Sequence, residues 1–397
     1  MFWKKIGPRK YIILISVLLA LVVLSTNSTL AANLKKSAQK SSFGRLIPKL
    51  KKTTKRFKEI VVSRQPKRRP AQKPVIAVSK STPEMTETAQ ESQPKNPAAT
   101  LPSEATRLSV SASGSFSADI PGAGTATFSK GEVVKVAYSN GTYFLVQDNH
   151  AAATSEEPIK FTPGAGSILN LPDFTDMNWN QTTNLNAFRG NIEIVFSNKS
   201  KTLWAVNELG LEDYQRGIAE ASHDSPVEHL KVMAIVSRSY AVHHLANGGR
   251  HAGEPFHLKN SRNGNGDDQV YRGYTAETRL PRIAKAAGDT QGTVVTYQGK
   301  PVITPYSTRA SGQTRTPAEA GWSYEWPWVK SVPDPDTAGM ERFGHGVGLS
   351  GHGSKKRAER GDSAATILGY YFPGTVLGQV DTSGQTVRVS IYGQPIK

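Results

Sequence analysis

The sequence contains no cysteine, so disulfide bonds and thiolate-bound metals are both excluded. It also lacks a His-Glu-x-x-His pattern, the spacing with which one face of a helix binds zinc. We therefore expect no metal and no cofactor. Chemistry in this chain has to come from its carboxyl, amine, imidazole, hydroxyl and aromatic side chains.

Acidic residues are nearly missing from the first 75 positions, where Glu59 stands alone among 19 lysines and arginines. The whole chain has 49 Lys and Arg against 32 Asp and Glu, so the other 322 residues carry 30 basic and 31 acidic side chains. The excess of positive charge in the formal total of +17 thus lies in the first 75 residues. We expect no nucleic acid as a partner, because the rest of the chain has no excess of positive charge.

A long apolar run is also missing. The longest one, Tyr11–Leu24, has 14 residues where a membrane-spanning helix needs roughly 20. Basic residues precede it, and small and polar residues follow it to Ala32. This pattern is typical of an export signal. We predict that residues 1–32 are a signal peptide or an uncleaved membrane anchor, and that the protein is exported to the cell envelope, secreted or membrane-anchored.

Residues 33–104 have the composition of a linker, basic up to Lys73 and then rich in Pro, Ser, Thr, Glu and Gln. Too few apolar side chains are present to offset the entropy of ordering, so disorder is predicted. The basic part, 33–75, is either a solvated spacer or a segment that binds anionic wall polymers or membrane lipids.

From residue 105 the pattern changes to short strands. Residues 108–113 alternate between apolar residues and serine, and two further apolar runs flank Asn140-Gly141, a strong signal for a two-residue hairpin turn. Residues 191–196 and 202–206 form another strand pair. We predict a small β domain at 105–200, packed on a mixed α+β domain at 201–397, which makes the fold class α+β.

The clearest helix of the second domain begins at Ser225-Pro226-Val227-Glu228, which reads as an N-cap serine, a first-turn proline and a capping-box glutamate. It is expected to end at Asn247-Gly248-Gly249. Further predictions are a helix at 276–287, strands at 293–297 and 302–306, a helix at 364–371 and a strand at 386–392.

Six stretches of the second domain combine glycines, aromatic residues and charged residues. They are Val206-Asn207-Glu208 with Leu211–Tyr214 and Gly217–Glu220; Leu230-Lys231 with Arg238–Ala241; Gln269–Gly273; Tyr306-Ser307 with Ser311-Gly312 and Thr314; Gly344–Ser350; and Tyr370–Thr375. Together they resemble the SpoIID/LytB family, which comprises stage II sporulation protein D and the amidase enhancer LytB. The resemblance covers about residues 185–378.

The resemblance implies an activity and a site. The family includes lytic transglycosylases that cleave the MurNAc–GlcNAc bond of peptidoglycan, preferring strands stripped of stem peptides. Glu220 matches the catalytic glutamate. The implied substrate-binding residues are Lys231, Arg238, Gln269, Tyr271, Tyr306, Ser307 and His345.

The chemistry of Glu220 can be considered apart from the family. A lytic transglycosylase needs one carboxyl group, because the muramic acid C6 hydroxyl is an intramolecular nucleophile. That carboxyl group has to stay protonated near neutral pH, which burial favours. No Lys or Arg lies between Gly217 and Glu228 to lower its pKa. The alternative is a surface acid or a helix-capping residue.

The other candidates have simpler alternatives too. Lys231 and Arg238 are two helical turns apart and either hold a sugar carboxylate or form a solvated basic stripe. His345 either binds substrate or makes structural hydrogen bonds. The aromatic residues at 322–328 either stack on sugar rings or belong to a core.

Three functions follow from these residues. The first is a peptidoglycan lytic transglycosylase. The second is a non-catalytic glycan-binding module that enhances a cell-wall amidase, which is favoured by departures from the family pattern such as Ala221 in place of Met. The third is a structural envelope protein that acts through its basic tether. The expected partners are peptidoglycan glycan strands and, for the second function, an amidase.

Overall fold

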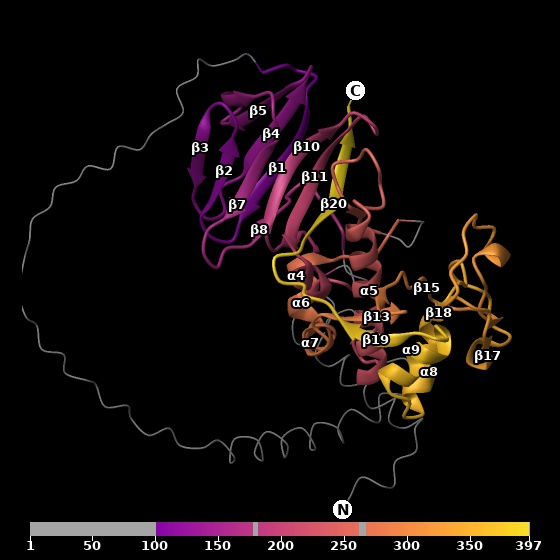
Figure 1. Ribbon diagram of the computed structural model, residues 1–397. Helices are drawn as coiled ribbons and strands as arrows, with labels where there is room; N and C mark the ends of the chain where they lie inside the picture. The colour runs from indigo at the N-terminus through magenta and orange to yellow at the C-terminus, as the bar shows by residue number, and fades with distance from the viewer. Residues whose placement is uncertain (1–100, 178–181, 262–266, 397) are drawn as a thin grey trace, which may run out of the picture. The chain divides into compact units, whose positions relative to one another are not determined.

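The computed structural model describes residues 101–177, 182–261 and 267–396, all within one compact unit of the chain. The predicted leader (1–32) and nearly all of the predicted linker (33–104) lie outside the described residues. The part described is α+β, with several sheets and six α-helices among its residues (Figure 1). No helix in this part is long and apolar enough to cross a membrane.

The strands fall mainly into two large sheets. Sheet one has the order β6-β5-β4-β1-β8-β9 and sheet two the order β12-β20-β11-β10-β7-β2-β3. Their bounds are β1 Thr106–Ala112, β2 Phe116–Ile120, β3 Gly124–Phe128, β4 Val134–Ser139, β5 Thr142–Gln147, β6 His150–Ser155, β7 Ile159–Pro163, β8 Leu169–Asn170, β9 Ala187–Phe188, β10 Asn191–Ser197, β11 Thr202–Gly210, β12 Leu258–Lys259 and β20 Thr386–Pro395.

The two large sheets share one apolar core. Leu108 and Val110 of β1, Ile192 and Ile194 of β10, and Leu203 of β11 are fully buried in it. In β10 these residues alternate with partly exposed ones, as expected for strands with one face against a second sheet. The predicted hairpin is confirmed: Asn140 and Gly141 both have positive φ and join β4 to β5.

Sheet two contains strands from both sides of the predicted domain boundary at residue 200. Strands β2, β3, β7 and β10 come from before it, and β11, β12 and β20 come from after it. Strand β11 pairs with β20 along its whole length, from Thr202 opposite Pro395 to Gly210 opposite Thr386. The division into domains at 105–200 and 201–397 stays a prediction. In the structure the two segments are joined by one hydrogen-bonded sheet.

Several of the remaining elements pack on one central helix, α5. The helices are α4 Leu211–Arg216, α5 Val227–Ala246, α6 Gly273–Arg279, α7 Pro281–Asp289, α8 Gly351–Glu359 and α9 Ala364–Tyr371; the short strands are β13 Thr293–Tyr297, β14 Lys300–Pro301, β15 Tyr306–Ser307, β16 Gly312–Gln313, β17 Pro333–Asp334, β18 Leu349–Ser350 and β19 Val376–Gln379. Helix α5 packs against α7, α8, α9 and β13 (Figure 1). Apolar residues lie all around it, which is typical of a helix buried on most sides.

Three local predictions differ from the structure. Pro226 rather than Ser225 is the N-cap of α5, and no side chain caps this end. Glu228 instead accepts hydrogen bonds from the Lys231 side chain and the Ala364 N–H, so the predicted capping box is wrong. The single helix predicted at 276–287 is two helices, broken before Pro281, and the strand predicted at 302–306 is replaced by short β14 and β15.

Candidate active site

Glu220 lies at the end of a short extended segment after α4. This segment pairs with residues 270–272: the Ala219 N–H donates to the Val270 carbonyl at 2.9 Å, and the Arg272 N–H donates to the Gly217 carbonyl at 2.8 Å. Gly217 permits this approach, because a Cβ there would lie 2.5 Å from the Tyr271 ring. The position of Glu220 is therefore fixed by backbone pairing rather than by a free loop.

The two carboxyl oxygens of Glu220 have different surroundings. Oε1 accepts hydrogen bonds from the Val270 N–H at 2.7 Å and from the Tyr306 hydroxyl at 3.1 Å. Oε2 has no hydrogen-bond partner among the described residues. One oxygen is held in place while the other stays available.

Burial raises the pKa of the Glu220 carboxyl, by disfavouring its anion. The hydrogen bonds from Val270 and Tyr306 and the charge of Arg272 act in the opposite direction and are outweighed. No lysine or arginine forms an ion pair with Glu220 in the described part of the chain. Its environment thus favours the protonated acid more than water does.

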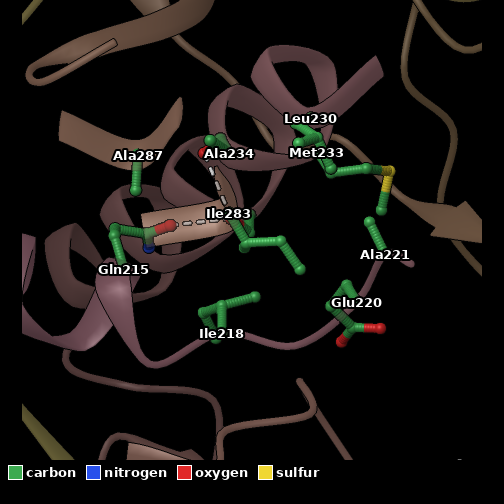
Figure 2. Close-up of a pocket in the computed structure, with 10 residues that line it drawn as sticks. Gln215, Ile218, Glu220, Ala221, Leu230, Met233, Ala234, Ile283 and Ala287 are labelled. Carbon is green, nitrogen blue, oxygen red and sulfur yellow. Dashed lines mark hydrogen bonds between the residues drawn. The ribbon is translucent and has the colours of Figure 1, made fainter. Parts of the chain in front are cut away.

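A small cavity lined mostly by apolar side chains lies on one side of Glu220. Four residues of one α5 face line it at helical spacing, Leu230, Met233, Ala234 and Ser237, together with residues of α4, α7 and the 217–221 segment. The space open to the centre of a water molecule is about 10 Å³, enough for roughly one water and far too small for a sugar. Figure 2 shows the carboxyl group pointing away from Leu230 and Met233, so any ligand of this group has to approach from the other side.

Tyr306 and Gln269 form a hydrogen-bonded chain that ends at Glu220. The Gln269 amide donates to the Tyr306 hydroxyl at 3.1 Å and to the Ser237 carbonyl, and its oxygen accepts from the Tyr214 hydroxyl at 2.9 Å. Every polar atom of the Gln269 side chain is thereby engaged. This chain fixes the direction in which the Tyr306 hydroxyl donates.

His345 supports the other end of Tyr306. Its Nδ1 accepts the Val347 N–H at 2.9 Å, and the ring also makes a hydrogen bond to the Tyr306 backbone. Burial lowers the pKa of His345 to about 4, so the ring is neutral at neutral pH. Gly348 lets β15 and β18 run side by side here, because a Cβ at this φ of 72° would lie 2.3 Å from the Pro305 carbonyl oxygen.

Ser307 and Tyr271, two other predicted site residues, form hydrogen bonds with neighbours of the site and not with Glu220. The Ser307 Oγ accepts the Gly346 N–H at 3.1 Å, which holds the glycine-rich loop against β15. Tyr271 is buried, and its hydroxyl donates to Asn207 at 2.9 Å. Both side chains thus hold neighbouring backbone or side chains in place, and neither forms a hydrogen bond with Glu220.

The two predicted basic residues do not meet Glu220. Lys231 forms an ion pair with Glu228 at 2.7 Å on a half-exposed surface of α5. Arg238 is fully buried, and its five N–H groups donate to Glu212, Thr290 and the carbonyls of Ala287 and Thr293. Arg238 has no donor left for a sugar, so its predicted role as a ligand contact is replaced by a structural one.

The aromatic residues at 322–328 divide into two groups. Trp328 donates to the Ile303 carbonyl and packs on Tyr297, as the core alternative predicted. Trp322 instead lies 5.0 Å from the His345 ring, measured between centroids, and contacts Tyr324 and Trp326. The side of His345 away from β15 is therefore covered by partly exposed aromatic rings.

Within the described residues, no group of three or more His, Asp or Glu side chains is arranged to hold a metal ion. The acid at Glu220 is instead surrounded by hydroxyl, amide and backbone groups. This set of groups suits proton transfer to and from an oxygen atom.

Comparison with known proteins identifies relatives of this region. The family model for stage II sporulation protein (SpoIID) matches residues 199–297. The amidase enhancer of Bacillus subtilis is 47% identical over 49 residues, 12% of this chain and 7% of that protein. Stage II sporulation protein D of Bacillus amyloliquefaciens is 22% identical over 275 residues, 45% of this chain and 77% of that protein. An uncharacterized protein of Brachyspira hyodysenteriae is 32% identical over 123 residues, 30% of this chain and 31% of its own length. The chain thus spans less than a third of two of these three relatives.

Proposed function

Given that this chain belongs to the SpoIID/LytB family, we propose that it is a peptidoglycan lytic transglycosylase of the cell envelope with Glu220 as its acid and base. Its substrate in this proposal is the glycan strand, cleaved between MurNAc and GlcNAc. The family assignment supports a role at the cell wall, and the surroundings of one side chain support the specific reaction.

The observation that carries the proposal is the asymmetry of the Glu220 carboxyl group. Oε1 is held by Val270 and Tyr306, while Oε2 has no partner among the described residues. A pKa raised by burial keeps a proton on the group at a higher pH than usual. An acid with one anchored and one open oxygen can deliver a proton from a defined position.

The reaction needs two proton transfers and no second carboxylate. In the first, protonated Glu220 donates to the glycosidic oxygen as the bond from the MurNAc anomeric carbon to that oxygen breaks, which releases GlcNAc as an alcohol. In the second, the resulting carboxylate takes the proton of the MurNAc C6 hydroxyl as that oxygen bonds to the anomeric carbon. The products are a 1,6-anhydro-muramyl end and a regenerated acid, without consumption of water.

Tyr306 has a defined part in this cycle. Its hydrogen bond to Oε1 strengthens when Glu220 is anionic, because bonds to a charged acceptor are stronger. The bond therefore stabilises the carboxylate between the two transfers. Gln269 and the neutral His345 keep Tyr306 in place.

The test is product analysis with a Glu220→Gln variant. We expect release of 1,6-anhydro-muramyl ends from peptide-free glycan to fall by about 10²–10⁴-fold, because the amide still accepts from Val270 and Tyr306 but has no acidic proton. Mass spectrometry of the products distinguishes anhydro ends from hydrolysed ends. Glu341→Gln, at an exposed acid, is the matched control and should cleave normally. Undiminished anhydro product from the Glu220 variant would refute the proposal.

A second candidate is a glycan-binding module that enhances an amidase. It is supported by the 47% identity of a short segment to the amidase enhancer of Bacillus subtilis. This function predicts that the chain sediments with purified sacculi and stimulates a cell-wall amidase while no soluble muropeptides appear. Glu220→Gln would leave that stimulation unchanged.

A further inference from the structure

Three arginines near His345 differ from most other arginines in their lack of an acidic partner. Arg309, Arg315 and Arg342 form no ion pair in the described part of the chain. Most of the other arginines there are paired with a carboxylate: Arg189, Arg216, Arg238, Arg250, Arg272, Arg357, Arg360 and Arg388. The exceptions elsewhere, Arg107, Arg279 and Arg282, lie on separate elements. Three guanidinium groups without a carboxylate partner at one place are therefore a local feature.

Backbone pairing gathers these three residues around the glycine-rich loop. Arg309 and Phe343 exchange two backbone hydrogen bonds of 3.2 and 3.3 Å, and the Arg309 guanidinium lies 5.8 Å over the Phe343 ring. The Arg315 N–H donates to the Gly346 carbonyl at 2.8 Å. The Arg342 side chain reaches within 2.9 Å, and that of Arg315 within 3.3 Å, of the place a Cβ on Gly346 would take.

The hydrogen bonding of the three guanidinium groups is incomplete. The Nε of Arg309 is buried without a hydrogen-bond partner among the described residues. Arg315 donates to the Glu319 carbonyl, and no hydrogen bond is formed by the exposed Arg342 side chain within the described chain. Arginine presents donors in a planar fork that fits a carboxylate, so unused donors here favour an anionic ligand.

Exposed aromatic rings lie next to these arginines. Trp322 contacts His345, Tyr324 is 49% exposed and lies 4.7 Å from Trp326, and Phe343 is 58% exposed. Such rings provide flat apolar surfaces with a polar edge, on which the C–H face of a sugar can stack. The combination of stacking rings and guanidinium groups without a carboxylate partner fits a sugar that carries a negative charge.

We propose that Arg309, Arg315 and Arg342, with the rings of Trp322, Tyr324 and Trp326, bind a MurNAc residue through its lactyl carboxylate. This inference rests on the proposed function only in taking a glycan strand as the ligand. In such a strand the lactyl group is the sole anion on the sugars, and an attached stem peptide converts it to a neutral amide. In this proposal the three arginines, called the arginine surface below, are the residues that distinguish peptide-free strands, which the family resemblance implies as the preferred substrate, from strands that carry stem peptides.

The arginine surface is connected to the catalytic acid through few steps. His345 contacts Trp322 on one side and the Tyr306 backbone on the other, and the Tyr306 hydroxyl holds Glu220. This surface also supplies the cationic contact for which Lys231 and Arg238 were candidates. Their charges are used within the fold, whereas those of the arginine surface are not.

The test compares ligands in the Glu220→Gln protein, so that binding is measured without cleavage. The ligands are peptide-free MurNAc–GlcNAc oligomers, the same oligomers with stem peptides, and GlcNAc oligomers of equal length. We expect the peptide-free oligomers to bind most tightly. An Arg315→Met/Arg342→Met variant should bind them about 10-fold or more weakly and bind GlcNAc oligomers unchanged, because only the former carry the carboxylate.

Controls separate the alternatives. Arg107→Met/Arg279→Met removes two exposed, unpaired arginines elsewhere and should change nothing. Arg342→Met alone, at an exposed side chain, should give a smaller loss of the same selectivity if the double variant is poorly folded. Equal losses for all oligomers, or no loss, would overturn the inference. So would poly(glycerol phosphate) binding as tightly as the peptide-free oligomers and with the same dependence on the arginines. Because no cleavage is measured, these outcomes are independent of the product assay for Glu220.

Discussion

Two acids, the partly buried Glu220 and Asp268, whose side chain is fully covered, contact the same short segment at 268–270 and have opposite properties. Asp268 accepts hydrogen bonds from the Tyr240 hydroxyl, Arg250, His251 and the Lys259 N–H. These contacts outweigh the effect of burial and lower the pKa of Asp268 to about 2. Glu220 receives two hydrogen bonds and no ion pair, and its pKa is raised. The number of donors and cations around each acid, not burial alone, decides its protonation state.

The difference assigns each acid a task. Asp268, which directly precedes Gln269 and Val270, is an anion at neutral pH and holds Arg250, His251 and Lys259. Gln269 and Val270 in turn hold Tyr306 and Glu220. Asp268, with four hydrogen-bond donors, therefore stabilises the structure around the site. Glu220, with only two donors and no cation partner, keeps a raised pKa within that structure.

The largest expected effect on stability is that of the Asp268→Asn substitution. The variant leaves Arg250 and His251 without their anion, which we expect to lower the free energy of unfolding by about 3 kcal/mol, the lower end for a buried pair since Arg250 reaches solvent. Glu220→Gln should cost about 1 kcal/mol or less, because the amide keeps both hydrogen bonds. Urea denaturation of both variants measures the contrast, and equal losses would show that the two acids do not differ.

Acid should reduce the contribution of Asp268 by a smaller amount. Its folded pKa of about 2 lies below the ordinary value of 3.8, so its stabilisation is complete above pH 3.8 and is lost as the pH falls toward 2. The shift corresponds to about 2 kcal/mol. Glu220 has the opposite sign, because its raised pKa gives stabilisation at low pH that is lost as the pH rises through the folded pKa.

The measurement is the stability difference between the wild type and Asp268→Asn, taken at several values between pH 5 and pH 2. It should narrow as the pH falls. A difference that stays constant over this range would contradict the assigned pKa of Asp268.

The smallest effect should come from Tyr306→Phe. It removes one of the two hydrogen bonds to Glu220 and makes this site less like that of Asp268. The pKa of Glu220 should move further up, and the limb of the pH–activity profile that reports it should shift to higher pH, with a rate loss of about 10-fold or less. Gln269 still donates to the Ser237 carbonyl, so stability should change little. A lower activity with an unshifted profile would mean that Tyr306 acts only through packing.

Local signals in the sequence predicted much of the fold. The Asn140-Gly141 turn and the helix over 364–371 were recognised because the determinants lie within a few residues. The capping box at Ser225 failed because Glu228 has better partners in Lys231 and in Ala364, far along the chain. Pairings over such distances leave no trace in a local pattern.

The site was predicted less evenly. The motif order brought Glu220, Gln269, Tyr306 and His345 to attention, and the structure links them by hydrogen bonds. The sequence could not reveal that Glu212 engages Arg238, since a basic residue on a helix looks the same whether paired or free. For the same reason the arginine surface was missed: its members stand out only once the partners of the other arginines are known.

The pairing of β11 with β20 has a consequence for how the site forms. Glu220, Gln269, Tyr306 and His345 all lie in the long segment between these two strands. The pairing of the strands therefore brings the two ends of that segment together. A loop of this size adds little entropic cost, since each doubling of length costs only about 0.6 kcal/mol. Contacts so distant along the chain are slow to find, however. Refolded protein should thus regain its secondary structure earlier than its ability to bind or cleave a sugar.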